Sequence, residues 1–206
     1  MFIDMGKRKY KMRKRAESQQ ATRARIVEAL IELHEELGPR QTTVSAIAER
    51  AGVQRLTVYR HFPDEAELFQ ACSSRWRELN PPPDPGTWAH QHDGLERCRT
   101  ALRALYAYYR GTAGMWAALL RDETSVPALQ GPMRDFRGYL TGIAEDLVQA
   151  LLPPAEHHLP TAATTSHVLQ FETWASLSAQ GLSDTEAADL ATAWVSSTAS
   201  AALRKH

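Results

Sequence analysis

The sequence has few features of an exported, membrane-spanning or disulfide-stabilised protein. Only two cysteines, Cys72 and Cys98, occur in 206 residues, too few for a disulfide scaffold. No run approaches the roughly 18 apolar residues that a membrane-spanning helix needs. The basic N-terminus is not followed by the apolar segment of a secretory signal. We therefore expect a cytoplasmic protein with reduced thiols and no membrane association.

Signatures of catalysis and of cofactor or metal binding are also missing. The chain has no GxSxG, Walker-type, GxGxxG or CxxC motif. His90 and His92 have no Cys or carboxylate at metal-site spacing beside them. A small all-helical enzyme would need a nucleophile–base pair or a metal arrangement that we do not find. We expect no catalytic residue, no metal site and no cofactor.

Helical periodicity is the dominant pattern that is present. Ile26, Leu30, Leu33 and Leu37 recur at helical spacing, and sustained period-two alternation is lacking. The fold class is therefore all-α, and we predict about nine helices, with a Pro-rich loop at 80–93. Their approximate ranges are 20–37, 44–51, 55–62, 64–79, 94–111, 113–121, 132–152, 160–180 and 184–204. Three residues are each followed three positions later by Glu, the spacing of a capping box: Asp64, Asp93 and Ser183.

Charge is distributed unevenly along a chain of zero net charge. Residues 1–62 hold 13 Lys and Arg against 7 Asp and Glu, and the remainder holds 11 against 17. Such a split suggests a basic module that meets a polyanion, joined to an acidic module with another role. We predict a basic disordered arm at 1–18, a DNA-binding domain at 19–64 and a helical domain at 65–206.

Residues 42–62 have the pattern of two short helices joined by a tight turn. They read TTVSAIAERAGVQRLTVYRHF, and Gly52 stands between the helices, where a residue without a Cβ adopts a positive φ at low cost. The pattern predicts a helix-turn-helix, whose second helix enters the DNA major groove by its N-terminal end. The apolar residues available to pack this pair against the first helix are Ile47, Ala48, Ala51 and Val53.

The stretch from Ile26 to Leu68 resembles the TetR-type family of one-component transcriptional regulators. The resemblance implies an N-terminal three-helix DNA-binding domain followed by a larger, variable helical domain for ligand binding and dimerisation. The matching features are Gly38, Thr42-Thr43-Val44, Ile47-Ala48, Ala51-Gly52-Val53, Thr57, Tyr59, His61-Phe62 and Leu68.

The resemblance also implies a set of DNA-binding residues, of which Arg55 has the best chemistry for reading a base. Its guanidinium matches guanine O6 and N7 bidentately. Leu56 could touch a thymine methyl group or pack on the basic arm. A half-buried structural histidine is the alternative for His61. The full set is Thr43, Gln54, Arg55, Leu56, Thr57, Tyr59, Arg60 and His61, with Thr43, Tyr59 and His61 as phosphate contacts.

Three departures from the family pattern affect this set. Gln54 replaces the usual Ser at the N-cap of the second helix, which leaves that helix end less well capped. Glu65 stands where the family usually has a phosphate-contacting Lys, so we leave it out. The basic arm is longer than the family needs. It could follow phosphates or enter an adjacent minor groove, or it is a solvated tail translated from a start codon upstream of the true one.

Aromatic and methionine side chains are concentrated on the helices that surround an effector cavity in the resembled family. Such residues line apolar small-molecule pockets, although ordinary core packing is the alternative for each. His167 is the polar candidate to orient a ligand. The predicted ligand-binding residues are Tyr106, Tyr109, Met115, Trp116, Phe136, His167, Phe171 and Trp174.

The last two predicted helices resemble the family's dimer interface, a four-helix bundle between subunits. Small residues allow close helix approach and a Trp can anchor an interface. The alternative is packing onto the chain's own core. The stripe consists of Ala187, Ala191, Trp194, Thr198 and Ala202.

These observations together imply a homodimeric transcriptional regulator, most simply a repressor, that binds a palindromic duplex operator and is released by a small-molecule effector. A helical adaptor, or a small-molecule-binding protein without regulatory DNA binding, is the alternative. The sequence identifies neither the effector nor the operator and its genes, and it does not separate repressor from activator.

Overall fold

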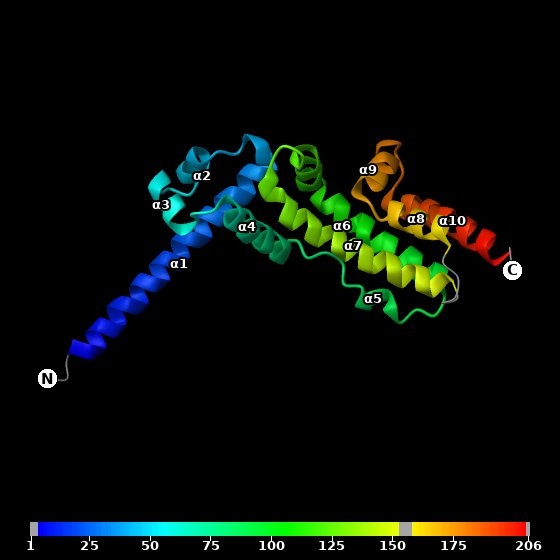
Figure 1. Ribbon diagram of the computed structural model, residues 1–206, viewed down its shortest axis with the longest axis horizontal. Helices are drawn as coiled ribbons and strands as arrows, with labels where there is room; N and C mark the ends of the chain where they lie inside the picture. The colour runs from blue at the N-terminus through cyan, green and yellow to red at the C-terminus, as the bar shows by residue number, and fades with distance from the viewer. Residues whose placement is uncertain (1–3, 153–157, 205–206) are drawn as a thin grey trace. The chain divides into compact units, whose positions relative to one another are not determined.

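The computed structural model describes residues 4–152 and 158–204, and every regular element in this part of the chain is a helix (Figure 1). This confirms the all-α class, with ten α-helices and two short 3-10 helices in the described residues where we predicted about nine helices. The elements are α1 (Asp4–Glu36), η1 (Pro39–Gln41), α2 (Val44–Arg50), α3 (Arg55–His61), α4 (Glu65–Leu79), α5 (Gly86–Ala89), α6 (Gly94–Asp122), η2 (Pro127–Leu129), α7 (Gln130–Leu151), α8 (Leu159–Val168), α9 (Phe171–Ala179) and α10 (Asp184–Leu203).

The chain divides into two compact units. Unit 1 consists of Met1–Leu79 and Ala117–Pro132, and unit 2 of Asn80–Trp116 and Met133–His206. The boundary therefore lies after α4 rather than at residue 64, because α4 packs against α1. Its apolar face, which includes Phe69, is buried in unit 1.

Helix α1 is the scaffold of unit 1, and α2 and α4 pack against it while α3 packs on α2. Ile26 and Leu30 of α1 are fully buried, as the helical periodicity predicted. The prediction of a disordered arm differs from the structure, in which α1 begins at Asp4 rather than near Gln20. The helix continues because residues 4–18 contain no Pro and consist largely of Lys, Arg and Met, which favour helix.

The helix boundaries in unit 2 differ from those predicted from the sequence. We predicted a break near residue 112, but α6 is continuous from Gly94 to Asp122, and the Thr112 hydroxyl donates to the Tyr108 carbonyl inside it. The predicted helix at 160–180 is instead two helices, α8 and α9. A short helix, α5, lies in the predicted loop because it buries Trp88 completely.

Helix caps follow the predicted spacings only in part. Ser183 and Glu186 form a complete reciprocal capping box at the start of α10. Asp93 accepts hydrogen bonds from two backbone N–H groups at the start of α6, but Glu96 pairs with Arg99 instead of closing the box. Among the described residues, no helix is both long and apolar enough to cross a membrane.

Candidate nucleic-acid interface

The helix-turn-helix of unit 1 is formed as the sequence predicted. The Thr43 hydroxyl accepts a hydrogen bond from the Ala46 N–H at 3.2 Å and caps α2. Gly52 has a φ of 64°, and the Val53 N–H donates to the Ala48 carbonyl at 2.9 Å, which closes the turn. The turn needs glycine because a Cβ at this φ would be strained.

The outer face of α3 presents side chains that have no partner within the described part of the chain. Val58 is buried and fixes the inner face of the helix. On the outer face, Leu56 is 67% and Tyr59 46% exposed. Leu56 is therefore a large apolar side chain exposed to solvent, in the position from which it could touch a thymine methyl group. The exposed members of the predicted DNA-binding set are Thr43, Gln54, Arg55, Leu56, Tyr59 and Arg60.

Gln54 is the N-cap residue of α3 and makes no side-chain capping hydrogen bond. This agrees with the weak cap predicted from its replacement of Ser. The N-terminal N–H groups of α3 are therefore not occupied by this side chain. The Thr57 N–H donates to the Gln54 carbonyl at 2.8 Å, so the N–H groups of Arg55 and Leu56 are the ones that remain available to solvent or to an anion.

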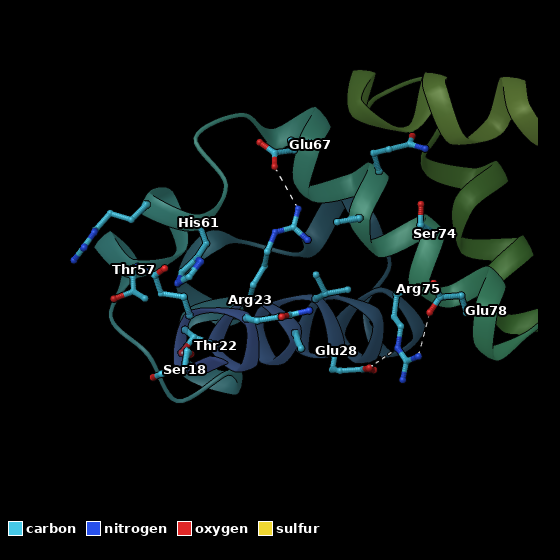
Figure 2. A pocket seen from close by; sticks show the side chains of 17 residues that line it. Ser18, Thr22, Arg23, Glu28, Thr57, His61, Glu67, Ser74, Arg75 and Glu78 are labelled. Carbon is cyan, nitrogen blue, oxygen red and sulfur yellow. Dashed lines mark hydrogen bonds and ion pairs between the residues drawn. The ribbon is translucent and has the colours of Figure 1, made fainter. Parts of the chain in front are cut away.

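Thr57 and His61 are half-buried, because they turn from the outer face of α3 toward a groove (Figure 2). The groove has a volume of about 1090 Å³ and lies between α1, α3 and α4. Phe62 is 3% exposed, as predicted for a core residue, and the Arg23 guanidinium lies 4.3 Å from the centre of its ring. Both readings of His61, phosphate contact and half-buried support, agree with this position.

Sequence reasoning missed the α1 side of this groove. Ser18, Gln19 and Thr22 line it together with Thr57, Arg60 and His61 of α3. The available signal was the polar run SQQAT at 18–22, which follows the basic segment directly. This run lies where the predicted arm (1–18) meets the first predicted helix (20–37), and the sequence does not show that it lies beside α3.

Ion pairs at the surface of unit 1 connect α1 to α2 and to α4. Arg50 of α2 binds Glu36 at 2.7 Å and Glu32 at 3.0 Å, and hydrogen bonding to Arg50 lowers the pKa of the Glu36 carboxyl. Arg75 of α4 binds Glu28 at 2.7 Å. Arg55 and Arg60, in contrast, make no ion pair within the described residues, so α3 carries uncompensated positive charge.

In unit 2, most of the predicted ligand-binding residues come together in one aromatic cluster. The Trp116 and Phe136 ring centres are 4.0 Å apart. Tyr109 contacts both of these rings edge-on, and it also contacts Phe171 and Trp174.

Tyr106 and Tyr109 are buried and anchor α6 to the α8–α9 turn. Their hydroxyls donate to the Val168 and Leu169 carbonyls, each at 2.8 Å. Burial raises the pKa of both phenols, so they act as neutral donors. Met115 is buried as well.

His167 differs from the prediction, because its side chain is exposed on α8 rather than turned toward the cluster. Only its backbone carbonyl has an inward role, accepting the Thr173 hydroxyl at 2.6 Å. In the residues that the structure describes, no three or more His, Cys, Asp or Glu side chains are grouped as a metal site would require.

The small-residue stripe of α10 is only partly at the surface. Ala187, Ala191 and Ala202 are buried in unit 2, so for them the alternative of packing on the chain's own core holds. Trp194 is 38% exposed and Thr198 is half-buried. The exposed side of α10 carries Leu190 and Trp194, and the helix has no charged residue from 190 to 203.

Comparison with known proteins supports the helix-turn-helix assignment. Residues 26–72 match the family described as bacterial regulatory proteins, tetR family. The HTH-type transcriptional regulator TtgR of Pseudomonas putida is 45% identical over 69 residues, 34% of this chain. The match covers 33% of that protein, so the chain aligns with about a third of the length of this curated relative.

Two solved structures share the fold over most of the chain. AibR, in complex with isovaleryl coenzyme A and operator DNA, has a TM-score of 0.56 and 16% identity, over 83% of this chain and 96% of its own. FadR from Bacillus subtilis, in complex with stearoyl-CoA, has a TM-score of 0.53 and 17% identity, over 86% and 97%. Residues 26–72 are thus similar to the helix-turn-helix segment of the tetR family of bacterial regulatory proteins, and the chain as a whole shares its fold with these two solved structures.

Proposed function

We propose that the protein is a transcriptional regulator that binds a palindromic duplex operator through α3, and that it acts as a repressor. The observation that carries the proposal is the outer face of α3, where Arg55, Tyr59 and Arg60 are exposed and have no partner among the described residues, beside a capped α2. Exposed cations and a phenol on the second helix of a helix-turn-helix suit major-groove and phosphate contacts. AibR, which shares the fold, was solved with operator DNA.

The protein acts as a homodimer through the exposed sides of α8 and α10. In support, these two helices pack against each other. Charge is scarce on their outer sides, since α8 contains no Asp, Glu, Lys or Arg and α10 has none after Asp189 within its bounds. An uncharged surface with an exposed Trp suits an interface core, where charged residues are depleted. A dimer is required for a palindromic site.

A small-molecule effector enters at the aromatic cluster and weakens operator binding. In support, α6 carries Tyr109 and Trp116 of the cluster and continues to Asp122 in unit 1. There the Asp122 carboxylate accepts the Arg40 N–H at 3.0 Å, just before α2. An effector that binds one position of α6 more tightly than another thus shifts the equilibrium toward that position and changes the Asp122–Arg40 contact next to the helix-turn-helix.

Selection of binding sites from random duplexes tests the operator proposal. We expect the full-length protein to enrich a two-fold symmetric sequence, because each α3 of a dimer reads one half-site. Mass spectrometry of the native protein tests the effector proposal. The first probes are acyl-coenzyme A thioesters, because AibR and FadR were solved with such compounds. Failure to enrich any sequence would contradict the operator proposal.

Two variants of α3 separate base reading from phosphate contact. Arg55→Ala should cost about 1–3 kcal/mol of specific affinity and relax the preference at one base pair per half-site. Tyr59→Phe should weaken all sequences to a similar extent, because a phosphate contact carries no direct sequence information. Repeating the site selection with each variant checks both. An unchanged consensus for Arg55→Ala would remove Arg55 from the base-reading residues.

A further inference from the structure

The first part of α1 stands clear of the rest of unit 1 (Figure 1). Residues 9–21 are all exposed, while burial begins with Ile26 and Val27. We call residues 9–18 the basic helix. It contains Lys9, Lys11, Arg13, Lys14 and Arg15, and one acid, Glu17. A helix that buries no apolar face gains no packing energy within the subunit, so its sequence is free to serve an external partner.

The positive charge of the basic helix is largely uncompensated. Of its five cations, Arg13 alone makes an ion pair with another described residue, Glu17, at 2.8 Å. Lys11 and Arg15 are four residues apart, a spacing at which like charges destabilise a helix. A polyanion laid against the helix removes this repulsion and releases counterions, which is favourable.

The base of the basic helix lies beside the recognition helix. Ser18 and Thr22 of α1 line the same groove as Thr57 and His61 of α3 (Figure 2). A duplex engaged by α3 therefore passes close to the point where the basic helix leaves the domain. Ten residues of α-helix span about 15 Å, which corresponds to roughly four base pairs at 3.4 Å each.

The distribution of side chains favours a nucleic acid over a membrane surface. Successive residues of an α-helix are about 100° apart, so the cations surround the helix rather than forming one face. The exposed apolar side chains Tyr10 and Met12 are separated by a rotation of about 200° around the helix axis, so they lie on opposite sides of the helix. A membrane-surface helix needs one continuous apolar face, which this segment lacks. A helix that is basic on all sides can meet the phosphates of both strands bordering a major groove.

We propose that the basic helix is a second DNA-binding element, which contacts the phosphates of about four base pairs flanking the half-site read by α3. This proposal rests on the proposed function, because it assumes that α3 faces a duplex. It replaces the disordered arm expected from the sequence by an ordered extension. Pre-formed helix loses less conformational entropy on binding than a coil would.

The test compares three full-length proteins on the same selected operator. The neutral variant is K9Q/K11Q/R13Q/K14Q/R15Q, and the matched control K9R/K11R/R13K/K14R/R15K keeps every charge. Each phosphate contact contributes about −0.9 to the slope of log affinity against log salt. We expect the neutral variant to flatten the slope by several units per dimer and to lose hydroxyl-radical protection of the flanks. The control should match the wild type in both measurements.

A fourth variant, Ala16→Pro, keeps all five cations but interrupts the helix, because proline lacks the N–H and clashes with the preceding turn. We expect it to lose ordered flank protection while keeping more of the salt dependence than the neutral variant. Flank protection equal to that of the wild type would overturn the helical part of the inference.

The outcomes separate this inference from the proposed function. If the wild-type protein selects no duplex sequence, the proposed function fails. If it selects one through Arg55, yet the neutral variant keeps the wild-type slope and footprint, the basic-helix inference is overturned while the proposed function stands. Sedimentation with phosphatidylserine–phosphatidylcholine vesicles is run in parallel. Charge-dependent vesicle binding together with an unchanged DNA slope would assign the helix to a membrane surface and overturn the inference.

Discussion

At the scale of single residues, His34 occupies an unusual position. It is 2% exposed, its ring packs against Phe69, and its Nδ1 lies 3.9 Å from the Cys72 sulfur. Within the part of the chain that the structure describes, its Nε2 has no hydrogen-bond partner. Burial lowers the pKa of His34 to about 4, and the nearby Asp122 carboxylate offsets only part of this effect. The folded protein therefore holds His34 neutral.

This burial predicts a loss of stability in mild acid. Between pH 6.5 and 4 the unfolded chain binds a proton at His34 and the folded protein does not, so the free energy of unfolding falls as the pH falls. The expected loss from this residue is roughly 2 kcal/mol between about pH 7.5 and pH 5. Urea unfolding at several pH values measures it. His34→Leu should remove this component, and an unchanged pH dependence in that variant would contradict the assignment.

At the scale of elements, the capping box of α10 predicts a measurable contribution to stability. The Ser183 hydroxyl accepts the Glu186 N–H and the Glu186 carboxylate accepts the Ser183 N–H. Removing such a cap costs about 1 kcal/mol. Ser183→Ala should therefore lower the free energy of unfolding by that amount in denaturant titrations.

A matched serine in the same helix provides the control for this prediction. Ser197 is exposed in the interior of α10 and is not at a cap. Ser197→Ala should leave stability unchanged or raise it slightly, since alanine has the highest helix propensity. Equal effects of Ser183→Ala and Ser197→Ala would mean that the cap contributes nothing beyond propensity.

At the scale of the whole molecule, the proposed dimer predicts that operator affinity depends on a residue far along the sequence from α3. Trp194→Glu places a charge in a surface that is otherwise uncharged, where an interface would have to desolvate it. We expect monomers by light scattering and a collapse of operator affinity, because a monomer engages one half-site. Gln149→Glu, an exposed position on α7, is the control and should remain dimeric. A dimeric Trp194→Glu protein would place the interface elsewhere.

The sequence alone predicted the local features of the DNA-binding segment. Helical periodicity located Ile26 and Leu30 in the core, Gly52 identified the turn, and Thr43 and Ser183 identified two helix starts. These features depend on interactions within a few residues: the steric freedom of glycine, the hydrogen bond of a cap, and the repeat of an apolar face. Arg55 and Tyr59 were indicated by the family resemblance rather than by periodicity, and both are exposed on α3.

Tertiary structure decided the features that depend on residues distant in the chain. Packing against each helix outweighs its local propensity. Packing therefore decides whether α6 breaks at Thr112. It also decides whether Ala187 faces a partner or the chain's own core. The same holds for His167, the polar residue expected to orient a ligand, whose side chain is exposed at the end of α8. That Ser18 and Thr57 line one groove could be seen only in the folded unit, because packing of α1 with α2 and α4 brings these segments together.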